Sequence, residues 1–260
     1  MKCWPLLNGS LLINYLKTKI LIFDNIKFLV KIDLGYNYVI DECKFYKYLG
    51  LIVDNLLKFD LHIDHITSKI QKRIGAMYRG SSLLPIKYRK MFANALTLPH
   101  FDYLDTIYGW ASKTKLNGLD ILYKKFAKIA LGVEMTESSL NVYRDMKWLP
   151  LHLRQQLHLS SYMLKIINGY SPSNFMHKFS YVSGGSREGA RCNLYIPKTS
   201  TLKQFYYLGA KAWNNLPQSL RLINDPKIFS KAYKTQLLNL ITEDPNYAIN
   251  NSFDYFYKLT

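Results

Sequence analysis

The hydrophobic period of this chain changes near His62, and that change constrains what the chain can fold into. Beyond this point large apolar residues recur at spacings of three and four, which is the period of an amphipathic helix. They are Ile63, Ile66, Ile70, Ile74 and Met77. Lys72 and Arg79 fall opposite this apolar row, whereas Lys69 and Arg73 lie toward its flanks. The pattern predicts one helix with a basic outer face.

The residues before the change have another character. Stretches 19–30 and 36–53 are rich in Ile, Val, Tyr and Phe, and turn signals at 24–25 and 33–35 accompany them. Such runs are typical of short antiparallel strands. We therefore predict an α+β fold that is mostly α. Its parts are a small antiparallel hairpin or sheet in residues 1–60, a helical bundle in 61–135 and a helical region in 136–260.

Local signals predict further helices. Pro85 can open a helix that Pro99 interrupts or kinks, and Gly132 is placed to end another. Pro150 suits the start of a helix over 151–167, and Asp225 followed by Pro226 suits the start of the last one. The helix that ends at Gly132 turns apolar residues inward and basic ones outward: Leu119, Leu122, Phe126 and Ile129 against Lys124, Lys125 and Lys128.

Residues 171–200 are rich in Gly, Pro and Ser and predict a long loop, which contains Arg187 and Arg191. The stretch near the start, 3–16, is shorter than the roughly 20 apolar residues that a spanning helix needs, so we expect no membrane segment. Lys2 followed by apolar residues also fits the beginning of a cleaved signal peptide, and that alternative stays open.

Charge and cysteine content bound the function. Lys and Arg total 35 against 18 Asp and Glu, a formal charge of +17, which favours a polyanionic partner. The three cysteines are widely spaced and form no CxxC pair, which disfavours a disulfide framework or a zinc knuckle. These features favour a reducing, intracellular compartment, nucleus or cytoplasm.

The sequence offers no catalytic constellation. Two-metal phosphoryl transfer needs clustered carboxylates, yet no two aspartates are adjacent, and we expect Asp102 and Asp105 to cap or contact neighbouring helices. His62 and His65 lack the spacing that puts two metal ligands on one helical face. Phosphate-loop, nucleophile-elbow and dinucleotide motifs are also missing from the sequence. We therefore predict no catalytic residue and no metal site.

Several strings resemble the reverse transcriptases of non-LTR retrotransposons, the jockey-like LINE group. The first follows the catalytic centre in that family: Trp4, Asn8, Leu12, Asn14, Lys17, Thr18, Lys19 and Phe23. The second, YLGLIVD at 48–54 with Leu57, Phe59, His62 and Ile63 after it, looks like the family's primer-grip hairpin and its lead into the thumb. Others are LPHFDY at 98–103, ALGV at 130–133, WLPL at 148–151 and YLGAKAWNNLP at 207–217, so the resemblance covers most of residues 4–240.

The resemblance implies RNA-directed DNA synthesis, with aspartates of the palm holding magnesium and the thumb gripping the template-primer duplex. In the family those aspartates belong upstream of the segment that begins at Trp4. We therefore expect a truncated polymerase fragment that is inactive alone and holds no cofactor itself. The primer-grip positions implied here are Tyr48, Leu49 and Gly50.

The residual function we expect is sequence-independent binding of RNA or DNA, as a hybrid or duplex, and possible association with an intact polymerase. The candidate contacts are Lys69, Lys72, Arg73, Arg79, Lys124, Lys125 and Lys128, with Arg187 and Arg191 as a second set. Tyr78, Tyr123 and Tyr206 are candidates for stacking on bases. Two alternatives are a non-functional relic and a helical protein-interaction module with a docking face of Phe205, Tyr207 and Trp213.

Overall fold

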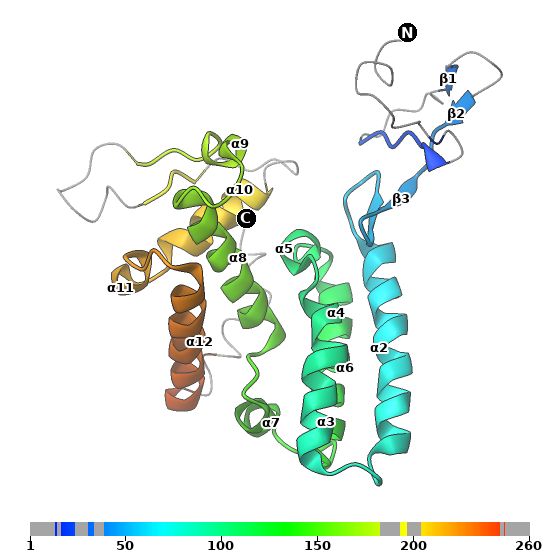
Figure 1. Cartoon of the computed structure of the whole chain (residues 1–260), viewed down its shortest axis with the longest axis vertical. Helices are drawn as coiled ribbons and strands as arrows, with labels where there is room; N and C mark the ends of the chain where they lie inside the picture. The colour runs from blue at the N-terminus through cyan, green and yellow to red at the C-terminus, as the bar shows by residue number, and fades with distance from the viewer. Residues whose placement is uncertain are drawn as a thin grey trace. The chain divides into compact units, whose positions relative to one another are not determined.

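The computed structural model describes Asn14, residues 17–23, 31–33, 39–182, 193–196 and 204–244, and Tyr247. The chain divides into two compact units, Met1–His62 and Ile63–Thr260. The first carries short strands and the second is helical, so the predicted class, α+β and mostly α, is confirmed (Figure 1). Some predicted positions lie outside the described residues: Trp4, Asn8, Leu12, Arg187 and Arg191.

The first unit contains two antiparallel strand pairs. Three of the four strands fall in the predicted stretch 36–53 or end beside it, whereas the strand at 31–33 lies between the two predicted stretches. Strand β1 (Lys31–Asp33) pairs with β2 (Val39–Asp41), and β3 (Phe45–Tyr48) pairs with β4 (Leu51–Asp54). The segment around Ile20 joins them, because the Cys43 amide donates to the Ile20 carbonyl at 2.8 Å. The Tyr46 hydroxyl also donates to the Lys17 carbonyl at 3.1 Å. These bonds link the strands to the preceding chain.

The turn that follows β4 is organised by the Asp54 carboxylate. It accepts hydrogen bonds from the backbone amides of Leu56 and Lys58, each at 3.0 Å, and of Phe59 at 2.7 Å. Leu57 and Phe59 adopt positive φ angles of 54° and 59°, which residues other than glycine rarely adopt. Three hydrogen bonds to one charged acceptor offset that strain, and they fix where helix α2 (Asp60–Gly80) begins.

The second unit continues α2 and adds helices of very different lengths. They are α3 (Ile86–Phe92), the π-helix η2 (Ala93–Thr97), α4 (Leu98–Asp102), α5 (Asp105–Tyr108), α6 (Lys113–Leu131), α7 (Ser139–Met146), α8 (Leu151–Ile167), α9 (Ser173–Met176), α10 (Gln204–Asn214), α11 (Gln218–Arg221) and α12 (Pro226–Glu243). Sequence analysis did not name α5, α7, α9, α10 or α11.

Local signals set several of these ends where they were predicted. Gly132 takes a φ of 72° at the end of α6, and Asp225 accepts from the amides of Lys227 and Ile228 at the start of α12. Pro99 changes the helix before it: the chain widens into η2 and resumes as α4. Proline has no amide hydrogen and crowds the carbonyl four residues earlier, and a π-turn accommodates both defects.

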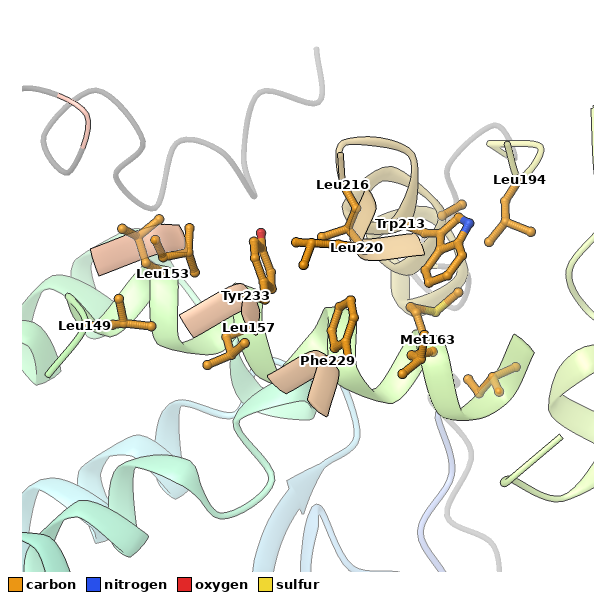
Figure 2. Packing of buried hydrophobic residues seen from close by; sticks show 14 of the residues in the cluster. Leu149, Leu153, Leu157, Met163, Leu194, Trp213, Leu216, Leu220, Phe229 and Tyr233 are labelled. Carbon is orange, nitrogen blue, oxygen red and sulfur yellow. The ribbon is translucent and has the colours of Figure 1, made fainter. Parts of the chain in front are cut away.

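A core cluster of buried residues surrounds α8, which packs against α10 and α12 (Figure 1). Figure 2 shows Leu149, Leu153 and Leu157 along α8 and the segment just before it, facing Phe229 and Tyr233 of α12. One buried polar side chain of α8 is paired across the boundary between α8 and α12. The Gln156 amide donates to the Tyr233 hydroxyl at 3.1 Å. The helix is thus enclosed by its neighbours.

A second buried centre gathers aromatic rings around Tyr123 of α6. Its ring stacks on Trp148 at a centroid distance of 4.9 Å and meets Phe101 edge-on at 4.9 Å. The Tyr123 hydroxyl donates to the Leu149 carbonyl at 2.8 Å, so its polar end is satisfied. This centre connects α4 and α6 to the start of α8.

In the described part of the chain, no helix combines the length and apolar character needed to cross a bilayer.

The packing around α8 predicts a large contrast between neighbouring residues of α12. Phe229 is 0% exposed and Ile228 is 61% exposed. Replacing Phe229 with Ala should lower the free energy of unfolding by about 3–5 kcal/mol, because it removes a buried ring and leaves a cavity. Ile228→Ala is the matched control and should change the free energy of unfolding by about 0.5 kcal/mol or less. Urea unfolding measures the free energy of unfolding of the two variants. An equal loss of stability in both variants would contradict the described core.

Candidate nucleic-acid interface

Four basic residues predicted to bind nucleic acid form one strip along α2. We call Lys69, Lys72, Arg73 and Arg79 the α2 strip. Lys69, Lys72 and Arg79 are exposed and Arg73 is half-buried. The apolar row from Ile63 to Met77 is buried, so the basic residues are left on the outer side of the helix as predicted.

The cations of the α2 strip are available for an external partner. Among the described residues none of the four has an ion-pair partner. From Lys69 to Arg79 the strip extends about 15 Å along the helix axis, at a rise of about 1.5 Å per residue. One strand of a duplex presents a phosphate about every 3.4 Å along its axis, so this length matches about four phosphates.

The pKa of His100 on α4 is affected by two cations of the α2 strip. Burial, followed by the charges of Arg73, Lys69 and His65, lowers the pKa of His100. Because the folded pKa is depressed, His100 is neutral at pH 7 and adds no charge of its own. Burial is the main cause of this depression, and the charges of Arg73 and Lys69 add to it because they disfavour a further cation beside the strip.

The three lysines of α6 differ from one another. Lys124 forms an ion pair with Asp120 at 2.6 Å, and the Lys128 ammonium donates to the Met135 carbonyl at 2.7 Å. Lys125 is exposed and has no such partner among the described residues. Lys124 and Lys128 are therefore half-buried and engaged within the chain, whereas sequence analysis placed all three outward. The Asp120–Lys124 spacing of four residues was a signal for this pair.

The predicted primer-grip residues form the tip of the β3–β4 hairpin. Tyr48 pairs with Leu51, and the two residues between them, Leu49 and Gly50, have φ angles of 47° and 87°. Two consecutive positive φ angles in a two-residue loop define a type I′ turn. The side chain of Leu49 is 72% exposed. Leucine also rarely adopts a positive φ angle, so the backbone at Leu49 is strained. The hairpin thus presents an apolar side chain at a strained, exposed tip.

The three tyrosines predicted to stack on bases differ in how deeply they are buried. Tyr78 is 70% exposed near the end of α2 and remains a candidate. Tyr123 is fully buried and hydrogen-bonded, so the expectation that it stacks on a base was wrong. Its helix buries that face in the core. Tyr206 is half-buried and packs edge-on against Phe179 and Phe205.

The predicted docking face on α10 is also corrected by the structure. Trp213 is 4% exposed and belongs to the core cluster around α8. Phe205 and Tyr207 are half-buried. The short helix α10 turns its largest side chain toward α8 because that contact removes the most apolar surface from water. Trp213 therefore does not offer an exposed docking surface.

Two aspartates gather with residues of α8 that sequence analysis missed. Asp102 accepts from the Arg154 guanidinium at 2.5 and 2.6 Å, and Asp105 lies 2.5 Å from the His158 imidazole. Burial raises the pKa of Asp105. The ligand atoms of Asp102, Asp105 and His158 are within 4.8 Å of one another, close enough for a metal. The Asp102 carboxylate, however, is already bound by the Arg154 guanidinium through both oxygens, and a metal would have to displace that cation.

The signal that could have found these partners is the spacing of Arg154 and His158. They are four residues apart and therefore share one face of α8. That spacing alone does not identify their acids, which are over fifty residues earlier in the sequence. The contacts confirm that Asp102 and Asp105 contact a neighbouring helix.

Comparison with known proteins adds a distant relationship. No family model matches the chain, and no solved structure matches it. Over 122 residues the chain is 25% identical to "Probable RNA-directed DNA polymerase from transposon X-element" of Drosophila melanogaster. The chain is a distant relative of a transposon reverse transcriptase. The match covers 45% of this chain and 13% of the length of that relative, so the activity of the whole relative is not transferred here.

The hairpin geometry makes a prediction about Leu49. Leu49→Asn should strengthen the β3–β4 pairing, because asparagine tolerates the left-handed conformation that a type I′ turn requires. Leu49→Val should weaken it, since a β-branched residue disfavours positive φ. Hydrogen exchange at the Leu51 amide measures the pairing. Slower exchange in the valine variant than in the asparagine variant would contradict the turn described here.

Proposed function

We propose that this chain binds nucleic-acid duplexes without reading their sequence, and that an RNA–DNA hybrid of the template-primer type is its natural partner. The observation that carries the proposal is the α2 strip, four cations on one helical face with no ion-pair partner among the described residues. Neutralising phosphates with such cations releases counterions, which gives affinity independent of sequence.

Two further features support the choice of a template-primer. The distant relative is named as an RNA-directed DNA polymerase, an enzyme whose chemistry takes place on such a hybrid. The strings at 48–54 and 98–103 resemble those that follow the catalytic centre in non-LTR reverse transcriptases. We propose that the β3–β4 hairpin corresponds to the primer grip and α2 to the first thumb helix, with Lys125 and Tyr78 as additional contacts.

The experiment that tests this proposal compares three proteins on a labelled RNA–DNA hybrid by fluorescence anisotropy. The first is the wild type, and the second carries glutamine at all four positions of the α2 strip. The third is a control that carries glutamine in place of four cations on other elements: Lys87, Arg144, Lys178 and Lys227. The control removes the same charge from the chain, so it separates a local contact from an effect of net charge.

The wild type should bind at low salt and lose affinity steeply as salt rises. In the strip variant the slope of log K against log salt should become shallower by about three to four units, since each lost phosphate contact removes about 0.9. The control should keep most of the wild-type slope. Equal slopes for the strip variant and the wild type would refute the assignment. Affinity that hardly changes with salt would instead favour an apolar interaction module.

The acidic residues make a separate prediction about catalysis. The sequence has no adjacent aspartates, and the described cluster of Asp102 and Asp105 is occupied by Arg154 and His158. We expect the purified chain, given magnesium, a primed RNA template and nucleotides, to extend no primer, because a two-metal centre needs free carboxylates. A primer-extension gel measures this. Extension that disappears in an Asp102→Asn variant would show that the cluster is catalytic.

A further inference from the structure

A second basic surface lies on α8 and α12, where none of the predicted contacts was placed. The two helices pack side by side (Figure 1). Residues of both helices line a cleft of about 620 Å³. Its basic lining comes from both helices and comprises Arg154, His158, Lys165, Lys231 and Lys234. Of the described residues that line the cleft, none is acidic. The cleft is therefore a concave site with an excess of positive charge.

The aspartates behind the cleft hold two of its residues in place. Asp102 binds Arg154 through two hydrogen bonds, and the other guanidinium nitrogen is left without a contact to Asp102. Asp105, which is buried, accepts from one imidazole nitrogen of His158 and leaves the second unused in that pair. Groups fixed in this way lose little conformational freedom when they bind a ligand.

The lysines of the cleft have no such support. Lys165 and Lys231 are exposed, Lys234 is half-buried, and none of the three has an ion-pair partner among the described residues. Burial, followed by the charge of Arg154, lowers the pKa of Lys234; the charge of Asp102 opposes this shift and that of Lys147 adds to it. Cations held this close repel one another, and a bound anion would relieve that repulsion.

The remaining lining residues indicate what kind of anion fits. The hydroxyls of Ser161 and Ser230 lie 2.9 Å apart and bridge the two helices. One of them donates to the other, and the accepting hydroxyl keeps its own hydrogen for a phosphate oxygen. Tyr162 also lines the cleft. Its half-buried ring meets Phe175 and Phe205 edge-on, and the part that remains exposed to the cleft can contact a base. Positive charge along a groove together with an aromatic ring is the combination that binds single-stranded nucleic acid.

We propose that the cleft between α8 and α12 binds the phosphate backbone of a single nucleic-acid strand, at a site separate from the α2 strip. From Arg154 to Lys165 the row along α8 is about 16 Å long, enough for more than one phosphate. This inference rests on the proposed function only in that both assign a nucleic acid as the ligand. An unpaired template strand beside a hybrid is a single strand whose phosphates and bases are accessible to such a cleft.

The test places the substitutions in the strip variant, so that the α2 strip cannot mask the result. Lys165, Lys231 and Lys234 are replaced together with glutamine in one protein and with arginine in another. A third protein, the control, carries glutamine at Lys87, Lys178 and Lys227. Fluorescence anisotropy with a short labelled oligodeoxythymidine measures binding, and thermal unfolding checks that each protein is folded.

The glutamine variant should lose about tenfold or more in affinity, and its salt slope should become shallower by about two units, at about 0.7 per phosphate contact on a single strand. The arginine variant and the control should bind as the strip variant does. Undiminished binding by the glutamine variant would overturn the proposal, and so would an equal loss in the control. Displacement of the strand by a mononucleotide at equal phosphate concentration would also overturn it, because the site would then hold isolated phosphates.

The same proteins separate this inference from the proposed function. The three glutamine substitutions in the cleft, placed in the wild-type background, should leave hybrid binding within about twofold, since the α2 strip is intact. If the wild type binds the hybrid but no single strand, the cleft proposal fails and the duplex proposal survives. If the strip variant binds the hybrid as the wild type does, the duplex proposal fails, whatever the cleft variant shows.

Discussion

The structure depends most on the burial of α8. An unpaired polar group in the core costs about 1–3 kcal/mol, and three polar side chains of α8 avoid that cost through partners on other elements. Arg154 and His158 bind Asp102 and Asp105, and Gln156 binds Tyr233. The buried side chains of Gln155 and Ser160 have no hydrogen-bond partner among the described residues. The three paired side chains join α8 to α4 and α5 on one side and to α12 on the other. The apolar cluster of Figure 2 then fills the space between them.

This arrangement affects the charge of the surface. The chain has 35 Lys and Arg against 18 Asp and Glu, and several of the acids are used inside the larger unit. Asp102 and Asp105 bind α8, and Asp120, which is largely buried, binds Lys124. Because these acids are engaged internally, they form no ion pair with the α2 strip or with the lysines of the cleft. The basic surfaces therefore follow from how the core satisfies its polar groups.

The sequence predicted those features that local signals encode. The basic face of α2 follows from helical periodicity, and the starts of α8 and α12 follow from Pro150 and Asp225. Features that depend on distant residues could not be predicted. Lys128 is bound by a loop carbonyl, and Tyr123 and Trp213 are buried by packing, which periodicity alone does not reveal. The cleft joins helices about seventy residues apart in the sequence.

Lysine acetylation footprinting tests the central claim, that the α2 strip contacts nucleic acid, most directly. The wild-type chain is treated with an acetylating reagent with and without a saturating RNA–DNA hybrid, and the modified lysines are quantified by mass spectrometry. The account predicts that the hybrid protects Lys69 and Lys72 several-fold, whereas Lys178 and Lys227 react equally in both samples. Equal reactivity of Lys69 and Lys72 with and without bound hybrid would contradict it.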